Sequence, residues 1–373
     1  MTVDWQTFRA HFPALNHWVY LITGGGAPVS DHAAAAGKAY FDEAESGGDT
    51  HWNTWLGRTD QARTTVARYF NVASDSIGFI GNASEALDIA ERLLGARGGA
   101  LALANDFPSL TFPWLNRGQR VQFVPADPDG RPRFEDLGVG DLTGIGTLLV
   151  GHVHYRTGYR VDLGEAAAFA RRHGLELVID ATQSVGVFDL DCAALNPALV
   201  TFSAYKWVGG GYGVGAVYVR PDLLLQRPLP VAGWRSAAVP YSLTTDHFVP
   251  GTATSVLEQG HPPFAPIFAL EAGLSLIASV GRAAVEARVA QLSAVLRSEI
   301  LRRGRTLLST QDPAAATGIV VAAADDAEAV QAALKAKRIL VGRFGQTLRF
   351  SVHAYTTEAE VLRALDGWDQ HCG

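Results

Sequence analysis

Cysteine is almost absent from this chain of 373 residues, which contains only Cys192 and Cys372. Two cysteines are too few for a disulfide framework or a cysteine-ligated zinc site, so we expect both to be inert thiols. Runs of eighteen apolar residues and basic tracts are absent as well. These absences argue against a membrane-spanning helix and against nucleic acid or an anionic membrane as a partner, and the net charge of −6 agrees.

The first residues, Met1 to Trp5, lack the charged and apolar regions of a secretory signal peptide, so we expect a cytosolic protein. Apolar residues make up 48% of the chain and charged residues 18%, which is typical of a globular protein. A chain of this length usually forms two domains. Strand and helix patterns alternate along most of it, and they predict an α/β fold.

A lysine, Lys206, lies just past a short apolar segment. Residues 197–202 read as a buried strand, so that Ser203, Tyr205 and Lys206 follow its C-terminal end. Open α/β sheets bind their ligands at this edge. The aromatic neighbours should partly desolvate the amine, which lowers its pKa and favours the neutral form that attacks a carbonyl. A solvated surface lysine would fit the same short motif.

Asp180 ends the preceding apolar strand pattern, 26 residues before Lys206. Two consecutive strand ends therefore present a carboxylate and an amine. Pyridoxal phosphate (PLP) needs this pair, because a lysine forms its Schiff base and an acid keeps its pyridine nitrogen protonated. Considered alone, Asp180 would fit a helix N-cap better.

With these two segments the chain resembles the class V aminotransferase family of fold-type I PLP enzymes, which includes cysteine desulfurases, kynureninases and isopenicillin N epimerase-like proteins. The resemblance runs from Val19 to the terminal helix. It implies a large PLP-binding domain, residues 16–250, with a mostly parallel seven-stranded sheet between helices. It also implies a smaller α/β domain, residues 1–15 and 251–373, and a homodimer with active sites at the subunit interface.

Ala83 and Ser84 begin a helix pattern that follows the strand pattern of residues 76–80. A small residue and a hydroxyl at a helix N-terminus present backbone N–H groups and the positive end of the helix dipole, which suits a phosphate. The alternative is that Ser84 caps its helix, and both roles are compatible. The resemblance implies that this segment grips the cofactor phosphate.

The resemblance implies further cofactor contacts, among them Ser203 and Tyr205 beside the lysine. Phe107, in a Phe-Pro-Ser segment shared with kynureninases and epimerase-like relatives, is expected to stack on the pyridine ring. His154 and Gln183 are expected to meet its phenolic oxygen. His152 and His154 also point the same way on an extended chain, as in a metal pair, but no third ligand is evident and we predict no metal.

Two more residues are expected near a cofactor across the dimer interface. Trp234 resembles the Gly-Trp of kynureninase-like relatives, and His261 holds the position of a residue that contacts the phosphate of the other subunit, a role for which Thr252 competes.

The glycine-rich residues 211–216 fit a loose dinucleotide fingerprint, but they lead into a strand pattern where the fingerprint requires a helix. We therefore expect a tight antiparallel turn there and no nucleotide.

Arg349 lies in the segment Leu-Arg-Phe-Ser, which resembles the family's Leu-Arg-x-Ser. A planar guanidinium suits a carboxylate, so we expect Arg349 to bind the α-carboxylate of an amino acid, with a surface arginine on a strand as the alternative. Desulfurases of the family carry a nucleophilic cysteine shortly before this motif, whereas residues 335–349 contain none. We therefore do not expect persulfide-forming desulfuration.

Together these residues predict a PLP-dependent enzyme that acts on an amino acid, with Lys206 as Schiff-base lysine and general acid or base and Asp180 as the support of the ring. An aminotransferase is the preferred reaction. A C–S lyase, a kynureninase-like C–C hydrolase or an epimerase would use the same residues. A non-catalytic PLP-binding protein is the third class.

Overall fold

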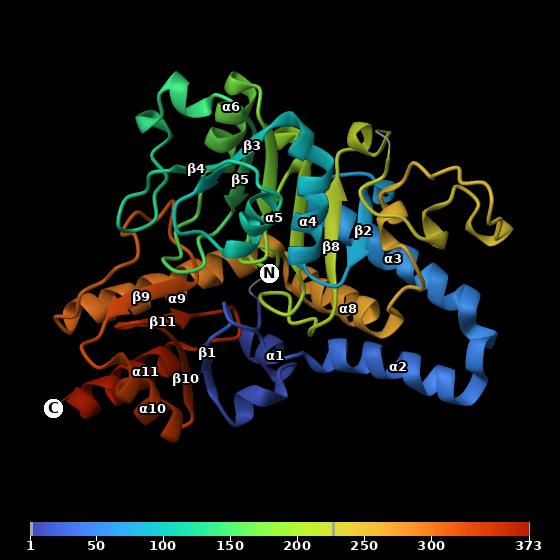
Figure 1. Ribbon diagram of the computed structural model, residues 1–373. Coiled ribbons are helices and arrows are strands. Elements are labelled where there is room, and N and C mark those ends of the chain that lie inside the picture. The colour runs from blue at the N-terminus through green and yellow to red at the C-terminus, as the bar shows by residue number, and fades with distance from the viewer. Residues whose placement is uncertain (1–2, 226–227, 373) are drawn as a thin grey trace.

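The computed structural model describes residues 3–225 and 228–372, and these form two β-sheets (Figure 1). The strands of the larger sheet, in their order across it, are β2 (Ile77–Ile80), β8 (Gly215–Val219), β7 (Leu199–Ser203), β6 (Glu176–Asp180), β5 (Ile145–Gly151), β3 (Gly99–Leu103) and β4 (Val121–Val124). Only β8 is antiparallel to its neighbours. The smaller sheet contains β1 (Val19–Leu21), β10 (Ile339–Phe344), β11 (Thr347–Ser351) and β9 (Ile319–Ala323), in that order.

Helices cover both faces of the larger sheet (Figure 1). The α-helices of the described chain are α1 (Trp5–Ala10), α2 (Asp31–Gly47), α3 (Trp52–Phe70), α4 (Ala83–Leu94), α5 (Phe112–Asn116), α6 (Leu163–His173), α7 (Cys192–Leu195), α8 (Phe264–Val280), α9 (Arg282–Arg302), α10 (Ala327–Ala336) and α11 (Glu358–Cys372). The predicted mostly parallel seven-stranded sheet between helices, with a smaller α/β part, is confirmed.

The faces of the larger sheet are defined by alternating side chains of its central strands. Leu148 and Ile179 lie in a core formed with α3, α6 and α8, whereas Leu149 and Val178 lie in the core under α4 and α5. All seven residues of β5 are buried. Such a strand must be central and parallel, because it has no face for solvent.

One predicted helix begins earlier than expected. The helix pattern of residues 60–70 by itself predicts a start at Asp60, but α3 begins at Trp52. Trp55 is 1% exposed, and its Nε1 donates to Glu43 Oε2 on α2 at 2.7 Å. Tertiary packing of this indole therefore extends the helix.

The smaller sheet packs against α9, α10 and α11, and Figure 1 shows α9 running between the two sheets. Two elements lie across the predicted domain boundaries. β1 pairs with β10 of the smaller sheet although its residues fall in the range 16–250, and α8, beyond residue 250, packs on α2 and α3. The division at residues 15 and 250 stays a prediction.

No single described helix is both long enough and apolar enough to cross a membrane. Only α8 and α9 taken together reach the required length and composition, and they are bent by 81° at the break between them.

The loop after β5 meets the smaller sheet at a glycine. Gly158 has φ of +75°, its carbonyl accepts from Thr317 Oγ1 at 2.7 Å, and an added Cβ would collide with the carbonyl oxygen of Ile319. The two sheets thus approach each other through backbone atoms at this point.

We predict that Gly158→Ala lowers the free energy of unfolding by roughly 3 kcal/mol or more, because alanine adds a collision to the cost of a positive φ. The matched control is Gly174→Ala, since Gly174 has φ of +65° and open space around its Cα. The control should lose about 1–2 kcal/mol. Denaturant unfolding measures both values, and equal losses would show that the contact with Ile319 does not matter.

Candidate active site

The carboxyl ends of three neighbouring parallel strands meet at one edge of the larger sheet. Gly151 at the end of β5 is paired with Asp180 at the end of β6, and Asp180 is paired with Thr201 of β7. The chain leaving β7 turns at once and carries Lys206, whose carbonyl accepts from the Gly209 amide at 2.9 Å. Parallel pairing therefore brings the predicted acid and amine to the same edge.

These strand ends surround a cavity of about 270 Å³. Its lining residues come from α4, the ends of β3, β5, β6 and β7 and the glycine-rich turn, and they are Asn82, Ala83, Ser84, Asp106, Phe107, Ser109, Gly151, Val153, Tyr155, Asp180, Thr182, Gln183, Ser203, Tyr205, Lys206 and Tyr212. Eight of the residues predicted to hold the cofactor are among them: Ala83, Ser84, Phe107, Asp180, Gln183, Ser203, Tyr205 and Lys206.

Lys206 is 8% exposed, and its Nζ lies 5.7 Å from the ring centroid of Phe107 and 5.6 Å from that of Tyr205. Burial lowers the pKa of Lys206 to about 8, and the charge of Arg349 adds to this, whereas the carboxylate of Asp180 opposes it. A far larger fraction of this amine than of an exposed lysine is therefore neutral and nucleophilic near neutral pH.

Asp180 accepts the backbone N–H of Thr182 at 2.9 Å. Burial raises the pKa of Asp180, while the hydrogen bonds from Thr182 and the charge of Lys206 act in the opposite direction. The alternative interpretation as a helix N-cap is wrong, because residues 181–190 form turns and bends and α7 begins only at Cys192. Among the described residues, Asp180 and Lys206 share the cavity without forming an ion pair.

The N-terminus of α4 reaches the cavity beside β7. Asn82, not Ser84, caps this helix by accepting the Glu85 amide at 3.2 Å, so the alternative role of Ser84 as the cap is wrong. Ser84 Oγ instead lies 2.7 Å from Ser109 Oγ, and the Ala83 amide donates to Ser203 Oγ at 2.9 Å. Three hydroxyls and the positive end of a helix dipole thus meet on one wall, which suits a phosphate.

Asp106 is a second buried carboxyl group that the sequence reasoning missed. It accepts the amides of Phe107 at 2.7 Å and Gly151 at 2.9 Å, and so ties the ends of β3 and β5 together. Burial, together with the charge of Asp180, raises the pKa of Asp106 to about 7. Its position directly before Phe107 fixes the backbone from which that ring, 39% exposed, lies against the cavity.

His154 does not line the cavity, contrary to the expected contact with the phenolic oxygen. Its Nε2 donates to the Asn105 carbonyl at 3.0 Å, and its Nδ1 accepts from the Thr157 amide at 3.2 Å. Burial lowers the pKa of His154 to about 4, so the ring is neutral and both of its nitrogens are used within the protein. A metal bridging His152 and His154 would break these bonds.

Tyr155 takes the place in the cavity that was expected of His154. The chain bends at His152 and turns from Tyr155 onward, yet Val153 and Tyr155 line the cavity and His152 and His154 do not, which matches the alternation of an extended segment. The signal was therefore present in the sequence, since the alternation that made the histidines look like a pair also assigns their neighbours to the opposite side.

Gln183 lines the cavity as predicted, with its amide held on both sides. Its Nε2 donates to the Gly24 carbonyl at 2.8 Å, and its Oε1 accepts from Trp207 Nε1 at 2.8 Å.

Trp234 and His261, which were expected near the cofactor, do not line the cavity. The rings of Trp234 and His261 lie 5.1 Å apart, and the ring of Trp52 contacts that of His261 as well.

Arg349, on β11 of the smaller sheet, is not a lining residue of the cavity but adjoins it through the lining residue Tyr155. It is 5% exposed, donates from Nη1 to the Tyr155 carbonyl at 2.8 Å and has an Nε without a hydrogen-bond partner. Burial lowers the pKa of Arg349 to about 10, so it is charged at neutral pH. In the described part of the chain no carboxylate pairs with it, which makes it a buried cation open to an anionic ligand.

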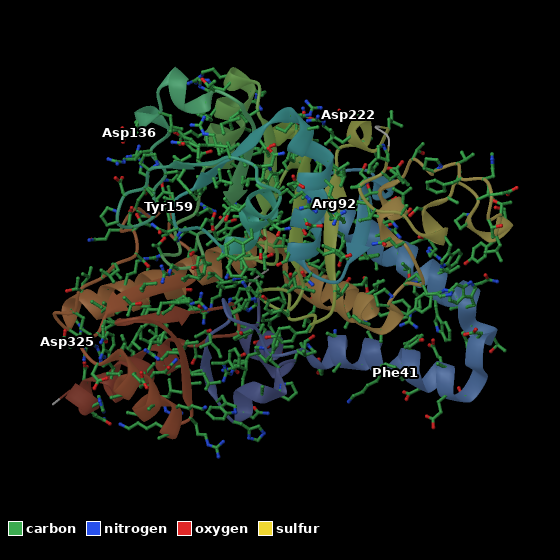
Figure 2. All side chains as sticks on the ribbon, viewed as in Figure 1. Phe41, Arg92, Asp136, Tyr159, Asp222 and Asp325 are labelled. Carbon is green, nitrogen blue, oxygen red and sulfur yellow. The ribbon has the colours of Figure 1, made fainter. Side chains whose placement is uncertain are left out.

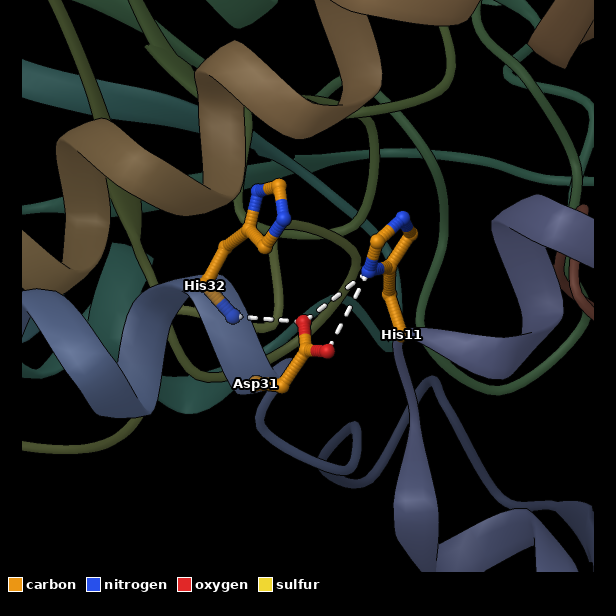
Figure 3. Close-up of side chains that lie close together, drawn as sticks. All are labelled: His11, Asp31 and His32. Carbon is orange, nitrogen blue, oxygen red and sulfur yellow. Dashed lines mark hydrogen bonds and ion pairs between the residues drawn. The ribbon is translucent and has the colours of Figure 1, made fainter.

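A different group of potential metal ligands, His11, Asp31 and His32, lies outside the cavity at the start of α2 (Figure 3). His11 Nδ1 lies 3.1 Å from Asp31 Oδ1, and the rings of the two histidines are 4.4 Å apart. Asp31 and His32 begin the helix, where the positive end of its dipole disfavours a cation. We assign these side chains to fixing the start of α2.

The sequence model of the family described as Aminotransferase class-V matches residues 19–364. The chain belongs to this family. Class V aminotransferases and their relatives are PLP enzymes, so the predicted family, cofactor and PLP-dependent activity are confirmed. An uncharacterized aminotransferase of Bacillus subtilis, YcbU, is 25% identical over 369 residues, which cover 97% of this chain and 96% of that protein.

Two solved structures share the fold of this class V chain. The apo structure of a cysteine desulfurase from Thermococcus onnurineus NA1 has a TM-score of 0.90 at 20% identity and covers 100% of this chain and 98% of its own. A lysine-to-alanine mutant of the protein C-DES, with glycine covalently linked to its PLP cofactor, has a TM-score of 0.86 at 22% identity and covers 99% and 100%.

We predict that acylation of Lys206 in the cofactor-free protein is half-maximal near pH 8, because burial depresses the pKa of its amine to about that value. Peptide mass spectrometry after brief treatment with acetic anhydride measures this, and a lysine-containing peptide, with a pKa of about 10.4, serves as the reference. Asp180→Asn should move the midpoint down and Arg349→Gln should move it up. A midpoint near that of the peptide would contradict a desolvated amine.

Proposed function

We propose that this chain is an aminotransferase that holds PLP at Lys206 and transfers the amino group of an amino acid. The observation that carries the proposal is the cavity that a buried amine, Lys206, and a half-buried acid, Asp180, both line without pairing, next to the unpaired cation Arg349. When bound, PLP supplies an electron sink for the charge that develops at the substrate Cα. The cytosolic location predicted from the sequence is kept as part of this proposal.

Lys206 serves as the base and acid of the reaction. Its Nζ, whose pKa of about 8 makes it neutral far more often than an exposed lysine, accepts the proton of the substrate Cα and then acts as the acid that returns it. The ring of Phe107 and the surrounding turn exclude water from this amine. The side chain of Asp180 faces the cavity to pair with a positively charged ring nitrogen, which would favour its ionised form.

The other side chains of the cavity position the cofactor and the substrate. The hydroxyls of Ser84, Ser109 and Ser203 beside the N-terminus of α4 hold a phosphate, and Gln183 directs its remaining amide hydrogen into the cavity. Arg349 holds the α-carboxylate through the N–H groups that it does not use on the Tyr155 carbonyl.

A lyase on the same scaffold is the second candidate, because the fold is shared with a cysteine desulfurase. Persulfide formation on a protein cysteine is not supported by the position of Cys192, which is buried in α7, where burial raises the pKa of its thiol. The side chain of Cys372 lies outside the described residues. A C–S lyase that does not use a cysteine nucleophile remains compatible with the cavity.

A homodimer with shared active sites belongs to the same proposal. Segment 239–249 presents five exposed apolar side chains, and Phe41 on α2 is 62% exposed as well (Figure 2). Exposed apolar side chains of this kind mark interaction surfaces. Trp234 contacts Tyr241 of this segment, and His261 contacts Trp234, which supports their predicted roles at the cofactor of a second subunit.

The test of the reaction is a spectral titration of the PLP-bound protein with a panel of amino acids, followed by product assays. An aminotransferase converts the amino acid to its keto acid, and a second keto acid is then aminated. Pyruvate with sulfide, or anthranilate, would instead identify a lyase or a C–C hydrolase. If no amino acid changes the spectrum of the PLP-bound protein, the proposal that this protein is an enzyme is contradicted.

In the same titration we expect Arg349→Lys to raise the half-saturating amino acid concentration roughly 10- to 100-fold, because lysine cannot replace a fork of charged N–H donors. The spectrum of the variant before addition of amino acid should equal that of the wild type. An unchanged half-saturating concentration would remove Arg349 from the substrate site.

For the shared sites we predict complementation between two inactive variants, Lys206→Ala and His261→Ala. In a mixed dimer the intact lysine of one chain and the intact histidine of the other meet in one site, so co-expression should restore up to about a quarter of the wild-type sites. Mixed dimers that stay inactive would show that each chain builds its site alone.

A further inference from the structure

We propose that the substrate carries a second carboxylate on its side chain, and that Arg156 binds this group while Arg349 binds the α-carboxylate. The inference rests on the proposed function, because it names the substrate class of the same site. It assigns a role to Arg156, a residue that neither the sequence motifs nor the cavity lining singles out.

The geometry starts from Tyr155, which lines the cavity and precedes Arg156 in the chain. The guanidinium carbon of Arg156 lies 5.7 Å from the ring centroid of Phe344, and that of Arg349 lies 4.8 Å from the same centroid. Arg349 also donates to the Tyr155 carbonyl at 2.8 Å. Two guanidinium groups, one buried and one exposed, therefore adjoin a single ring at the side of the cavity.

Both of these cations are unneutralised. In the described chain neither Arg156 nor Arg349 forms an ion pair, whereas Arg343, one residue before Phe344, pairs with Glu328 at 3.2 Å. Arg160, four residues after Arg156, pairs with Glu286 at 2.8 Å. Two positive charges left open beside one cavity attract a ligand with two negative charges, and the exposed one also speeds its entry.

The surface next to the two arginines is apolar. The ring of Tyr155 contacts Phe107 edge-on at 5.3 Å between centroids, and it contacts Phe344 at 5.8 Å and 90°. These rings can cover the methylene groups that separate two carboxylates in an amino acid such as glutamate. A monocarboxylic substrate would satisfy Arg349 alone, and an uncharged amide in place of the acid would lose the charge-assisted hydrogen bonds to Arg156.

The test compares glutamate with glutamine, and aspartate with asparagine, on the PLP-bound protein. We expect kcat/KM for the acid to exceed that for its amide at least 10-fold in the wild type. Arg156→Gln should reduce this preference about 10-fold, mainly by raising KM for the acid, and Arg156→Lys should retain part of it. The matched control Arg343→Gln removes an equal charge next to Phe344, but one already paired with Glu328, and should leave the preference in place.

A second measurement does not depend on turnover. Glutarate has two carboxylates and no amine, whereas butyrate has one carboxylate on an aliphatic chain of similar length. We expect glutarate to bind the PLP-bound protein more tightly than butyrate in calorimetry, and Arg156→Gln to abolish the difference. Thermal unfolding of each variant shows whether it folds. If glutamine at this exposed position disturbs the fold, the Arg156→Lys variant provides the comparison instead.

The outcomes separate the two proposals. If neutral amino acids react as well as the acids and Arg156→Gln changes nothing, the second-carboxylate site is overturned while the aminotransferase proposal stands. If no amino acid alters the cofactor spectrum or yields a product, the aminotransferase proposal fails and this inference fails with it.

Discussion

The parallel pairing of β5, β6 and β7 is the constraint on which the site depends. These strands are parallel and end in register. Asp180, at the end of β6, and Lys206, just after β7, are therefore brought to the same edge of the sheet. The edge where they meet is enclosed by helices and turns, and desolvation there raises the pKa of Asp180 and lowers that of Lys206. The perturbed acid and base are thus consequences of sheet topology before any ligand is considered.

The second requirement is contact between the two sheets. The smaller sheet supplies Arg349, and this arginine is held against the larger part of the chain by its bond to the Tyr155 carbonyl. A few residues further on, Gly158 lets the backbone of the same loop touch the start of β9. The loop after β5 therefore contacts the smaller sheet at two points, at Arg349 and at the start of β9.

Membership of the class V family establishes a PLP-dependent enzyme, but it does not establish which reaction the enzyme catalyses. A desulfurase and this chain share a fold at 20% identity, yet the cavity described here contains no cysteine among its lining residues. The same amine, acid and phosphate cradle serve several outcomes at the substrate Cα and beyond it, so the outcome is decided by groups at the periphery of the cavity. We propose that Tyr155, Arg156 and Phe344 are such groups.

The sequence by itself determined the strands and helices with strong periodicity, the order of motifs that identifies the family, and the residues adjacent to strand ends, including Lys206, Asp180 and Ser203. These follow from local patterns, because a buried strand and a helix start are recognisable in a few consecutive residues. Only the tertiary structure decided that Asn82 caps α4, that Trp55 lengthens α3 and that β1 joins the smaller sheet, since each depends on a partner distant in sequence. It also decided that His154 turns into the protein while Tyr155 enters the cavity, because the imidazole is held by the Asn105 carbonyl and the Thr157 amide.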